Sequence, residues 1–337
     1  MDKIRIAQIG TSRMSHGNNI WLGLRSRPDL FEVVGYAFPE NEREKFPEQT
    51  AAFEGCREMT VEEILADPTI EAVAVETEEI YLTKYALMVA KAGKHLHMEK
   101  PGGQSLADFE ALIDTLRHSG KVFSTGYMYR YNPTLIRLFR QIEAGELGEI
   151  LSVDAQMSCT HPADVRSWLA CMQGGMLFFL GCHLIDLVYR IQGEPDSVIP
   201  LTRRTGLDGA AGEDFGMAVL AYPNGVSTVK TADVQHGGFA QRQLLVMGSK
   251  KTVVVRPLEM YSETAAGLLY TDTVEYASTD WLDKGVFCRS EDYDRYDAML
   301  TAFARRIRGE YEETTYTLDY ELALYRLIQR CCALHGD

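Results

Sequence analysis

KIRIAQIGTSRMSHG (residues 3–17) decides the fold, because a strand pattern runs directly into a glycine turn and then into a helix. Ile4, Ile6 and Ile9 have the spacing of a buried first strand that ends at Gly10. Residues 17–24 then continue with helical spacing. The stretch therefore predicts a strand, a tight turn and a helix, the unit that opens a doubly wound parallel sheet.

The same alternation of strand and helix continues along the first part of the chain. Ser105 is the expected cap of one helix, and Gly93 and Gly120 are the expected stops of two. Short alternating elements of this kind are typical of a parallel α/β sheet. The expected strands are residues 31–38, 71–76, 94–99 and 121–127, and the expected helices are residues 60–67, 81–93 and 105–120.

The pattern changes after NPTLIRLFRQIEAGELGEI (132–150), where a helix gives way to longer strand-like stretches and hairpin turns. We expect two domains: residues 1–126 as an α/β Rossmann domain, and residues 127–337 as an α+β domain on a mostly antiparallel open sheet. The second domain has expected strands at residues 150–158, 215–234 and 242–257, and expected helices at residues 174–191, 294–308 and 318–334.

Composition excludes several classes of partner. The formal net charge of −14 and the pI near 5.1 give no basic surface for nucleic acid or for an anionic membrane. The N-terminus enters a strand at once, without a signal-peptide pattern, and no apolar run approaches the ~18 residues of a membrane span. A cytoplasmic location is the expectation.

The sequence predicts no metal site. Its seven cysteines are scattered and form no C-x-x-C pair, which argues against a disulfide framework and against zinc. His95 and His97 alternate along one expected strand, but no third ligand stands near them in the sequence.

Four strings occur in an order and at separations that are specific: AGKHLHMEKPGGQSL (92–106), STGYMYRYNP (124–133), GELGEI (145–150) and GGMLFFLGCHLIDLV (174–188). Together they resemble the Gfo/Idh/MocA oxidoreductase family, over nearly the whole chain. The resemblance implies a Rossmann domain that binds NAD or NADP, and a second domain whose sheet forms a substrate wall and often an oligomer interface. It also implies oxidation of a ring hydroxyl of a sugar or cyclitol, or the reverse reduction.

The resemblance assigns roles to individual positions. Lys100 matches the lysine of the family's E-K-P motif, and His183 matches its acid/base histidine. Histidine suits proton transfer near neutral pH, and a lysine ammonium stabilises negative charge on oxygen. The alternatives are a solvated lysine at a strand end and a structural helix histidine beside Asp186. The cofactor-binding positions are Gly10, Ser12, Arg13, Phe38, Thr77, Glu99 and Lys100, and the substrate positions are Tyr129, Arg130, Trp168 and His183.

The cofactor half departs from the family pattern at three places. Ser12 and Ser15 stand where the turn has a glycine and a small residue. Phe38 replaces the acid that accepts the ribose hydroxyls; it either stacks on adenine or belongs to the core. Glu78 and Glu79 replace a Pro-Asn pair, and they either face the diphosphate or point into solvent.

The substrate half departs at Phe179, which replaces an aspartate four residues before His183. Tyr129 and Trp168 either line a carbohydrate pocket or pack as ordinary aromatic residues. We therefore expect an NAD(P)-dependent oxidoreductase acting on a sugar, cyclitol or related polyhydroxylated compound, as a homo-oligomer. The alternatives are a redox-neutral lyase, isomerase or hydrolase on the same scaffold, and a non-catalytic sugar-binding or sensory protein.

Overall fold

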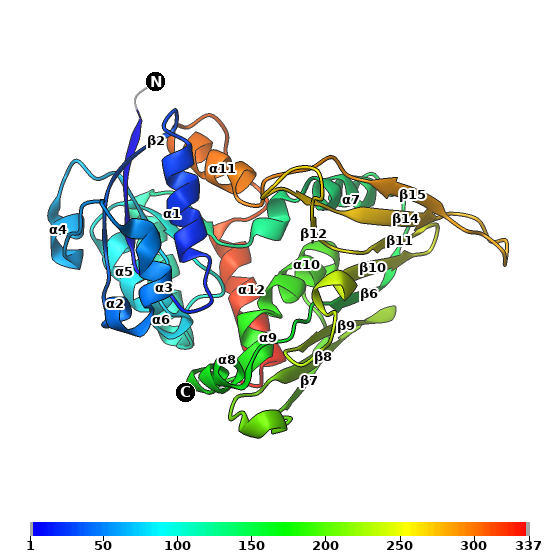
Figure 1. The fold of residues 1–337 in the computed structure, drawn as a ribbon. Helices are drawn as coiled ribbons and strands as arrows, with labels where there is room; N and C mark the ends of the chain where they lie inside the picture. Colours follow the sequence, from blue (N-terminus) through cyan, green and yellow to red (C-terminus); the bar gives the residue numbers. More distant parts are fainter. Residues whose placement is uncertain (1–2, 335–337) are drawn as a thin grey trace. The chain divides into compact units, whose positions relative to one another are not determined.

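The computed structural model describes residues 3–334, which form two compact units (Figure 1). The first unit contains the chain up to Tyr127 and also Tyr296–Tyr325. Of the described residues, the second contains Met128–Arg295 and 326–334. The expected fold class is confirmed: a parallel sheet in the first unit, and a mostly antiparallel sheet in the second.

The first unit is built on a five-stranded parallel sheet with the order β2-β1-β3-β4-β5. Because β2 and β3 lie on opposite sides of β1, the switch point of the sheet lies at the carboxyl end of β1, where such folds bind ligands. Its strands are β1 (Ile4–Ile9), β2 (Phe31–Ala37), β3 (Ala72–Val75), β4 (His95–Met98) and β5 (Phe123–Thr125). Its helices are α1 (Gly17–Ser26), α2 (Glu42–Lys45), α3 (Pro47–Thr50), α4 (Val61–Ala66), α5 (Leu82–Lys91), α6 (Leu106–Ser119), α11 (Asp297–Ile307) and most of α12 (Leu318–Cys331).

The return of the chain to the first unit corrects the expected division, which placed all residues after 126 in the second domain. Helix α11 packs on α1, where Arg27 pairs with Asp297 at 2.5 Å. In α12, the ring of Tyr325 stacks on Phe109 of α6 with the centroids 4.0 Å apart. These contacts join residues about 200 or more positions apart, so local sequence pattern gives no sign of them.

The second unit is built on an eight-stranded sheet with the order β15-β14-β11-β10-β6-β9-β8-β7. All of its neighbouring strands pair antiparallel except β6 and β9, which run parallel. Its strands are β6 (Ile150–Gln156), β7 (Ser197–Arg203), β8 (Phe215–Tyr222), β9 (Gly225–Ala232), β10 (Gln243–Gly248), β11 (Thr252–Val255), β14 (Asp272–Tyr276) and β15 (Val286–Arg289), with a separate pair β12 (Met260–Tyr261) and β13 (Leu269–Tyr270). Its helices are α7 (Pro133–Glu143), α8 (Ala163–Trp168), α9 (Gly175–Phe179) and α10 (Cys182–Gln192).

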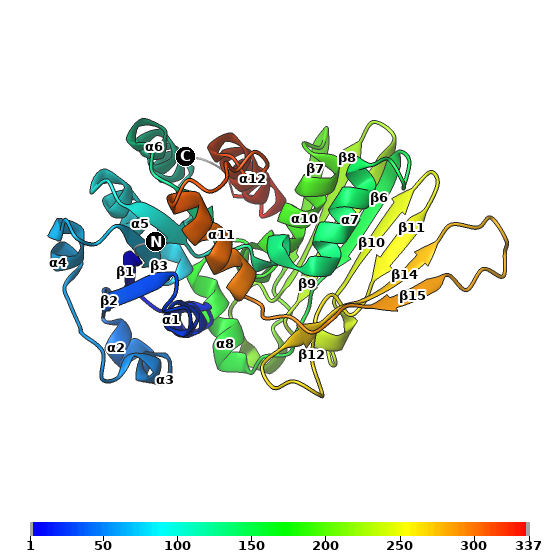
Figure 2. The same cartoon turned by 90° about the horizontal axis from the view of Figure 1, so that it is seen from above.

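Only one face of this sheet is covered by helices. Helices α9 and α10 pack against β6, β8 and β9, and Figure 2 shows α7 and α10 on the same face of the sheet. Residues of that face are buried, as Ala218, Val229 and Leu244 show with 0% exposure. The opposite face carries exposed apolar side chains, Ile199 and Met247 among them.

The single helix expected at residues 174–191 is instead two helices, α9 and α10, separated at Leu180 and Gly181. Packing at the break requires a glycine. A Cβ at Gly181 would lie 2.6 Å from the Leu177 carbonyl oxygen and 2.9 Å from Cγ2 of Thr231. The backbone therefore passes close to β9 at this point, and α10 begins afresh at Cys182.

Candidate functional site

The turn after β1 depends on Gly10. Its φ of +88° is one that L side chains rarely adopt, and a Cβ there would lie 2.4 Å from Cγ2 of Thr77. Thr77 follows β3, so the carboxyl ends of β1 and β3 approach each other more closely than a side chain allows. Both residues were predicted to border the cofactor, and the structure brings them together at the switch point.

Ser12 and Ser15 close the turn with their side chains. The backbone N–H of Ser12 donates to Oγ of Ser15 at 3.1 Å, and the N–H of Ser15 donates to Oγ of Ser12 at 3.0 Å. Oγ of Ser15 also accepts from the N–H of Gly17 at 3.2 Å, at the start of α1. Arg13, between them, is half-buried, and its carbonyl oxygen accepts from Gln49 at 2.8 Å. The two serines thus hold the turn in shape where the usual pattern has small residues.

A carboxyl enters this turn from a position that the sequence analysis did not single out. Oε2 of Glu42, in the first turn of α2, accepts from the backbone N–H of Thr11 at 3.1 Å. Burial raises the pKa of Glu42 to about 9, so at neutral pH the group is a neutral carboxyl beside the turn. Its signal in the sequence is an acid four residues beyond Phe38, just past the place where an acid is expected.

Phe38 itself belongs to an aromatic cluster. Its ring lies 4.7 Å from Tyr36 and 4.9 Å from Phe53, centroid to centroid. Arg43 lies over the same ring at 5.3 Å. The geometry matches the core alternative for Phe38, while its cofactor role stays a prediction.

Three buried carboxyls and one lysine gather at the carboxyl ends of β3 and β4. Glu76, Glu79, Glu99 and Lys100 are each at most 2% exposed. Nζ of Lys100 lies 3.5 Å from Oε1 of Glu99. Burial raises the pKa of Glu79 and of Glu99 to about 7, against the lowering effect of the Lys100 charge. Burial and the neighbouring Glu99 raise the pKa of Glu76 well above its usual value.

This cluster removes two of the alternatives left open by the sequence. Lys100 is not a solvated lysine, because it is buried against Glu99. Glu78 and Glu79 do not point into solvent either: they are 7% and 0% exposed. Glu78 pairs with Lys45 at 3.2 Å, and Glu79 lies in the buried cluster, where the neutral form of its carboxyl is favoured.

His95 and His97 are neutral side chains of β4. Burial lowers the pKa of each to about 4. Nδ1 of His95 accepts from the N–H of Val122 at 3.0 Å, which ties β4 to the segment before β5.

In the second unit, His183 lies at the start of α10 and is 1% exposed. The ring of Tyr129 meets it edge-on, with the centroids 5.2 Å apart. The Tyr129 hydroxyl donates to Glu259 at 2.6 Å, and Glu259 also pairs with Arg242 at 3.0 Å and with Arg295 at 2.8 Å. Burial and the Glu259 charge raise the pKa of Tyr129 well above its usual value, so Tyr129 acts as a hydrogen-bond donor and not as a base.

Arg130 forms a buried ion pair with α10. Its Nε and Nη2 donate to the two oxygens of Asp186 at 3.0 and 2.8 Å. Asp186 lies one turn after His183 on the same helix, so this bidentate pair fixes the helix that carries the histidine. The predicted contact of Arg130 with substrate stays a prediction.

Phe179 and Trp168 form an aromatic pair in the second unit. Their rings meet edge-on at 5.4 Å. The side chain that replaces the expected aspartate therefore packs on the tryptophan that was predicted to stack on sugar.

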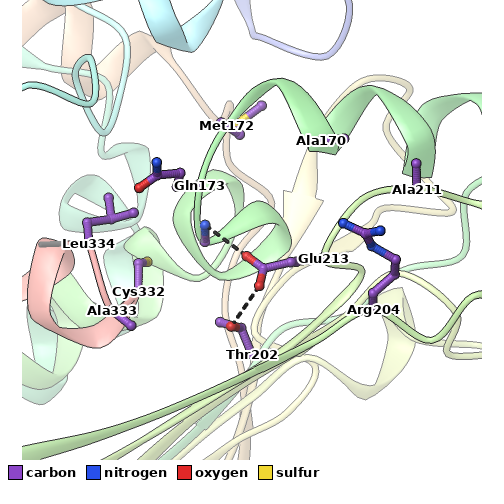
Figure 3. A pocket seen from close by; sticks show the side chains of 11 residues that line it. Ala170, Met172, Gln173, Thr202, Arg204, Ala211, Glu213, Cys332, Ala333 and Leu334 are labelled. Carbon is purple, nitrogen blue, oxygen red and sulfur yellow. Dashed lines mark hydrogen bonds between the residues drawn. The ribbon is translucent and has the colours of Figure 1, made fainter.

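A pocket of about 360 Å³ lies beside α9, lined by Gln173, Arg204 and Glu213 among others (Figure 3). Glu213 accepts from the N–H of Gly174 at 3.0 Å and from the Thr202 hydroxyl at 3.0 Å. A Cβ at Gly175 would lie 2.2 Å from the Glu213 carbonyl oxygen. Gly175, the first residue of α9, is thus required by this close approach, and the Glu213 carboxylate has a structural role.

Family comparisons cover both units. A family model described as an oxidoreductase family with an NAD-binding Rossmann fold matches residues 4–127. The model of the GFO/IDH/MocA C-terminal domain matches residues 136–254.

The chain belongs to the Gfo/Idh/MocA oxidoreductase family.

Individual relatives of this Gfo/Idh/MocA protein share modest identity. Myo-inositol 2-dehydrogenase of Thermotoga maritima is 24% identical over 76% of this chain and 70% of its own length. The 1,5-anhydro-D-fructose reductase of Ensifer adhaerens is 24% identical over 74% of this chain and 73% of its own length. Among solved structures, UDP-N-acetylglucosamine 3-dehydrogenase of Acidithiobacillus ferrooxidans superposes with a TM-score of 0.74 at 19% identity, covering 99% of this chain and 98% of that one.

The cofactor of this Gfo/Idh/MocA oxidoreductase is NAD or NADP. The residues of the first unit fit a dinucleotide at the β1 turn, because Gly10 gives the turn its positive φ and lets the ends of β1 and β3 meet, and the serines close the turn at the start of α1. The raised pKa values of Glu42, Glu79 and Glu99 reduce the negative charge that a diphosphate would meet. Among residues 3–334, no helix has the length and apolar character needed to cross a membrane.

Glu79→Gln should stabilise the protein in a pH-dependent way. The folded state binds a proton at Glu79 more tightly than the unfolded chain does, so wild type loses stability as pH rises from about 4.5 to about 7. Glutamine is neutral throughout and avoids this loss. Above that window we expect the variant to be more stable by on the order of 2–3 kcal/mol, with the gain disappearing below it.

Thermal unfolding of wild type and Glu79→Gln on both sides of the window measures this effect. Glu62→Gln, at an exposed carboxylate of α4, is the matched control and should change little at either pH. A Glu79→Gln variant that is no more stable than wild type at high pH would show that burial does not raise the pKa of Glu79.

Proposed function

We propose that this protein is an NAD(P)-dependent oxidoreductase that transfers hydride to or from a sugar, a cyclitol or a related polyhydroxylated compound. The observation that carries the proposal is the buried Lys100, 2% exposed, at the carboxyl end of β4 in a Rossmann unit. Relatives named for inositol and anhydrofructose support the substrate class. We also propose a cytoplasmic location, in keeping with seven free cysteines.

Lys100 and His183 are the proposed catalytic pair. A hydroxyl that is oxidised to a carbonyl must lose its proton, and His183 takes it at an imidazole nitrogen; in reduction, His183 returns it. The Lys100 ammonium is suited to stabilise negative charge that develops on a reacting oxygen. The bound dinucleotide supplies the hydride acceptor or donor.

The remaining residues hold these two in position. The Arg130–Asp186 pair fixes α10, and Tyr129 packs against the imidazole while its hydroxyl is held by Glu259. In the first unit, Glu42 brings a carboxyl to the turn at which the ribose-binding acid is missing from position 38. We infer that Glu42 takes over contacts to the ribose hydroxyls.

Lys100→Met and His183→Asn should each lower kcat by roughly 10²–10⁴-fold, the usual contribution of such groups. Dinucleotide binding should survive His183→Asn, because that residue acts on the substrate. Product analysis with a panel of polyols and sugars, with and without NAD or NADP, measures both effects. Lys91→Met and His118→Asn, at exposed sites of α5 and α6, are the controls.

Two results would contradict this function. Unchanged turnover in either catalytic variant would remove that residue from the reaction. Product formation without any net change in the dinucleotide would instead favour a redox-neutral lyase or isomerase. The replacement of the expected aspartate by Phe179 matters less for such a reaction.

We also propose that the protein is a homo-oligomer that covers the open face of the second unit's sheet. Ile199 is 57% exposed and Val226 is 50% exposed on that face, and Leu201 and Met247 extend the apolar surface. Apolar surface of this kind marks an interface in many proteins.

Sedimentation at micromolar concentration should therefore show a dimer or tetramer. The double variant Ile199→Glu with Leu201→Glu should sediment as a monomer, because charges would be buried at the interface. Leu22→Glu, at an exposed leucine of α1 in the first unit, should leave the oligomer intact. A monomeric wild type would contradict the proposal.

A further inference from the structure

Cys159, His161 and Asp233 bring three potential metal ligands together in the second unit. Their ligand atoms all lie within 4.8 Å of one another. Sγ of Cys159 is 3.5 Å from Nδ1 of His161 and 3.0 Å from Oδ1 of Asp233. Nδ1 of His161 is 2.5 Å from the same Oδ1.

The topology of the sheet explains why these residues meet. Strands β6 and β9 run parallel, so their carboxyl ends lie at the same edge. Cys159 and His161 follow β6, and Asp233 follows β9 directly. The N–H of Cys159 donates to the Ala232 carbonyl at 3.0 Å, and the N–H of His161 donates to the Asp233 carbonyl at 3.2 Å. Two chain segments 72 residues apart are thus locked in register.

One oxygen of the Asp233 carboxylate can still accept a hydrogen bond or bind an ion. Its side chain is 0% exposed, and its Oδ2 has no hydrogen-bond partner among the described residues. A buried carboxylate oxygen without a partner is costly unless a ligand compensates it. His161 is 23% exposed, which leaves an entry path for a small ion from the solvent side.

We propose that Cys159, His161 and Asp233 bind a divalent cation of the zinc type. One thiolate, one imidazole and one carboxylate form a ligand set that Zn²⁺ accepts, and three protein ligands leave a fourth position for water or a substrate oxygen. Binding releases the thiol proton of Cys159 to solvent, and Nδ1 of His161 must give up any proton so that the imidazole binds the ion in its Nε2–H form. This proposal replaces the expectation from sequence that the chain has no metal site, and it does not depend on the proposed redox function.

The distances suit such a site after a small adjustment. Ligand atoms around a tetrahedral Zn²⁺ are about 3.4–3.6 Å apart, given bond lengths of about 2.0–2.3 Å. The Cys159–His161 separation of 3.5 Å already meets this value. The contacts of Asp233 Oδ1, at 3.0 and 2.5 Å, are those of hydrogen bonds, and they lengthen when the ion takes the place of the shared protons.

A nucleophilic Cys-His-Asp relay is the main alternative, and the geometry disfavours it. In a relay, one ring nitrogen faces the nucleophile and the other faces the carboxylate. Here Nδ1 of His161 faces both Cys159 and Asp233. All three side chains therefore converge on one point, as ligands of an ion do.

Neighbouring residues support the positions of the ligands. Arg166 donates through Nε to the His161 carbonyl at 3.1 Å, and the Thr160 hydroxyl donates to the Gln235 carbonyl at 2.6 Å. Burial and the Asp233 carboxylate raise the pKa of the Cys159 thiol well above its usual value, against the lowering effect of the Arg242 charge, and Arg242 is itself paired with Glu259 at 3.0 Å. The site thus has a fixed backbone and a paired cation beside it.

Titration of chelator-treated full-length protein with Zn²⁺ and with Co²⁺ tests the proposal. We expect one ion per chain by elemental analysis. Co²⁺ should give the visible bands of a four-coordinate ion together with a thiolate-to-cobalt charge-transfer band in the near ultraviolet. Since changes outside the ligand shell already weaken metal binding about 10–100-fold, Cys159→Ser, His161→Gln and Asp233→Asn should each weaken it by at least that much.

Cys288→Ser and His236→Gln are the controls, one at another free cysteine of this unit and one at an exposed histidine near Asp233. Both should bind the ion as wild type does. Wild type without stoichiometric binding, a Co²⁺ spectrum without the thiolate band, or undiminished affinity in Cys159→Ser would each overturn the proposal. The wild-type Co²⁺ spectrum decides the matter even where a ligand variant fails to fold.

Discussion

The contact between Gly10 and Thr77 is the constraint on which the candidate cofactor site depends. Because a Cβ at Gly10 would lie 2.4 Å from Thr77, the ends of β1 and β3 meet at the switch point and the turn into α1 leaves from there. The other positions of this turn differ from the family pattern. Ser12 and Ser15 bond each other's backbone, and Glu42 occupies the Thr11 N–H. Side-chain contacts of Ser12, Ser15 and Glu42 therefore close the turn in this protein.

Electrostatics at the same edge of the sheet follow from burial. Lys100 brings one positive charge to three buried carboxyls, too few to keep all of them ionised, and the pKa values of Glu79 and Glu99 rise to about 7. A site that contains several acids is therefore less negative than its sequence suggests. Because Glu79 and Glu99 carry less negative charge than free carboxylates, their position beside the dinucleotide turn is compatible with the family's NAD-binding Rossmann fold.

Much of the fold could be predicted from local pattern, because strand alternation, the Ser105 cap and the glycine stops are short-range signals. The motifs likewise predict roles for Lys100 and His183, and these roles stay predictions. Local pattern did not predict those features of the structure that depend on contacts between segments far apart in the sequence. The packing of α11 and α12 in the first unit, the break at Gly181 and the burial of Glu79 all depend on residues far away in the sequence. The meeting of Cys159 with Asp233 depends on the pairing of β6 with β9, which no spacing of cysteines reveals.

Calorimetric titration of the purified protein with NAD, NADP and their reduced forms tests the central claim most directly. It should follow a check for dinucleotide that co-purifies with the protein. The account predicts micromolar or tighter binding of at least one form, since the Gly10 turn is intact and the nearby carboxyls are largely neutral at pH values below about 7. Absence of binding by all four forms, with no dinucleotide carried through purification, would contradict it.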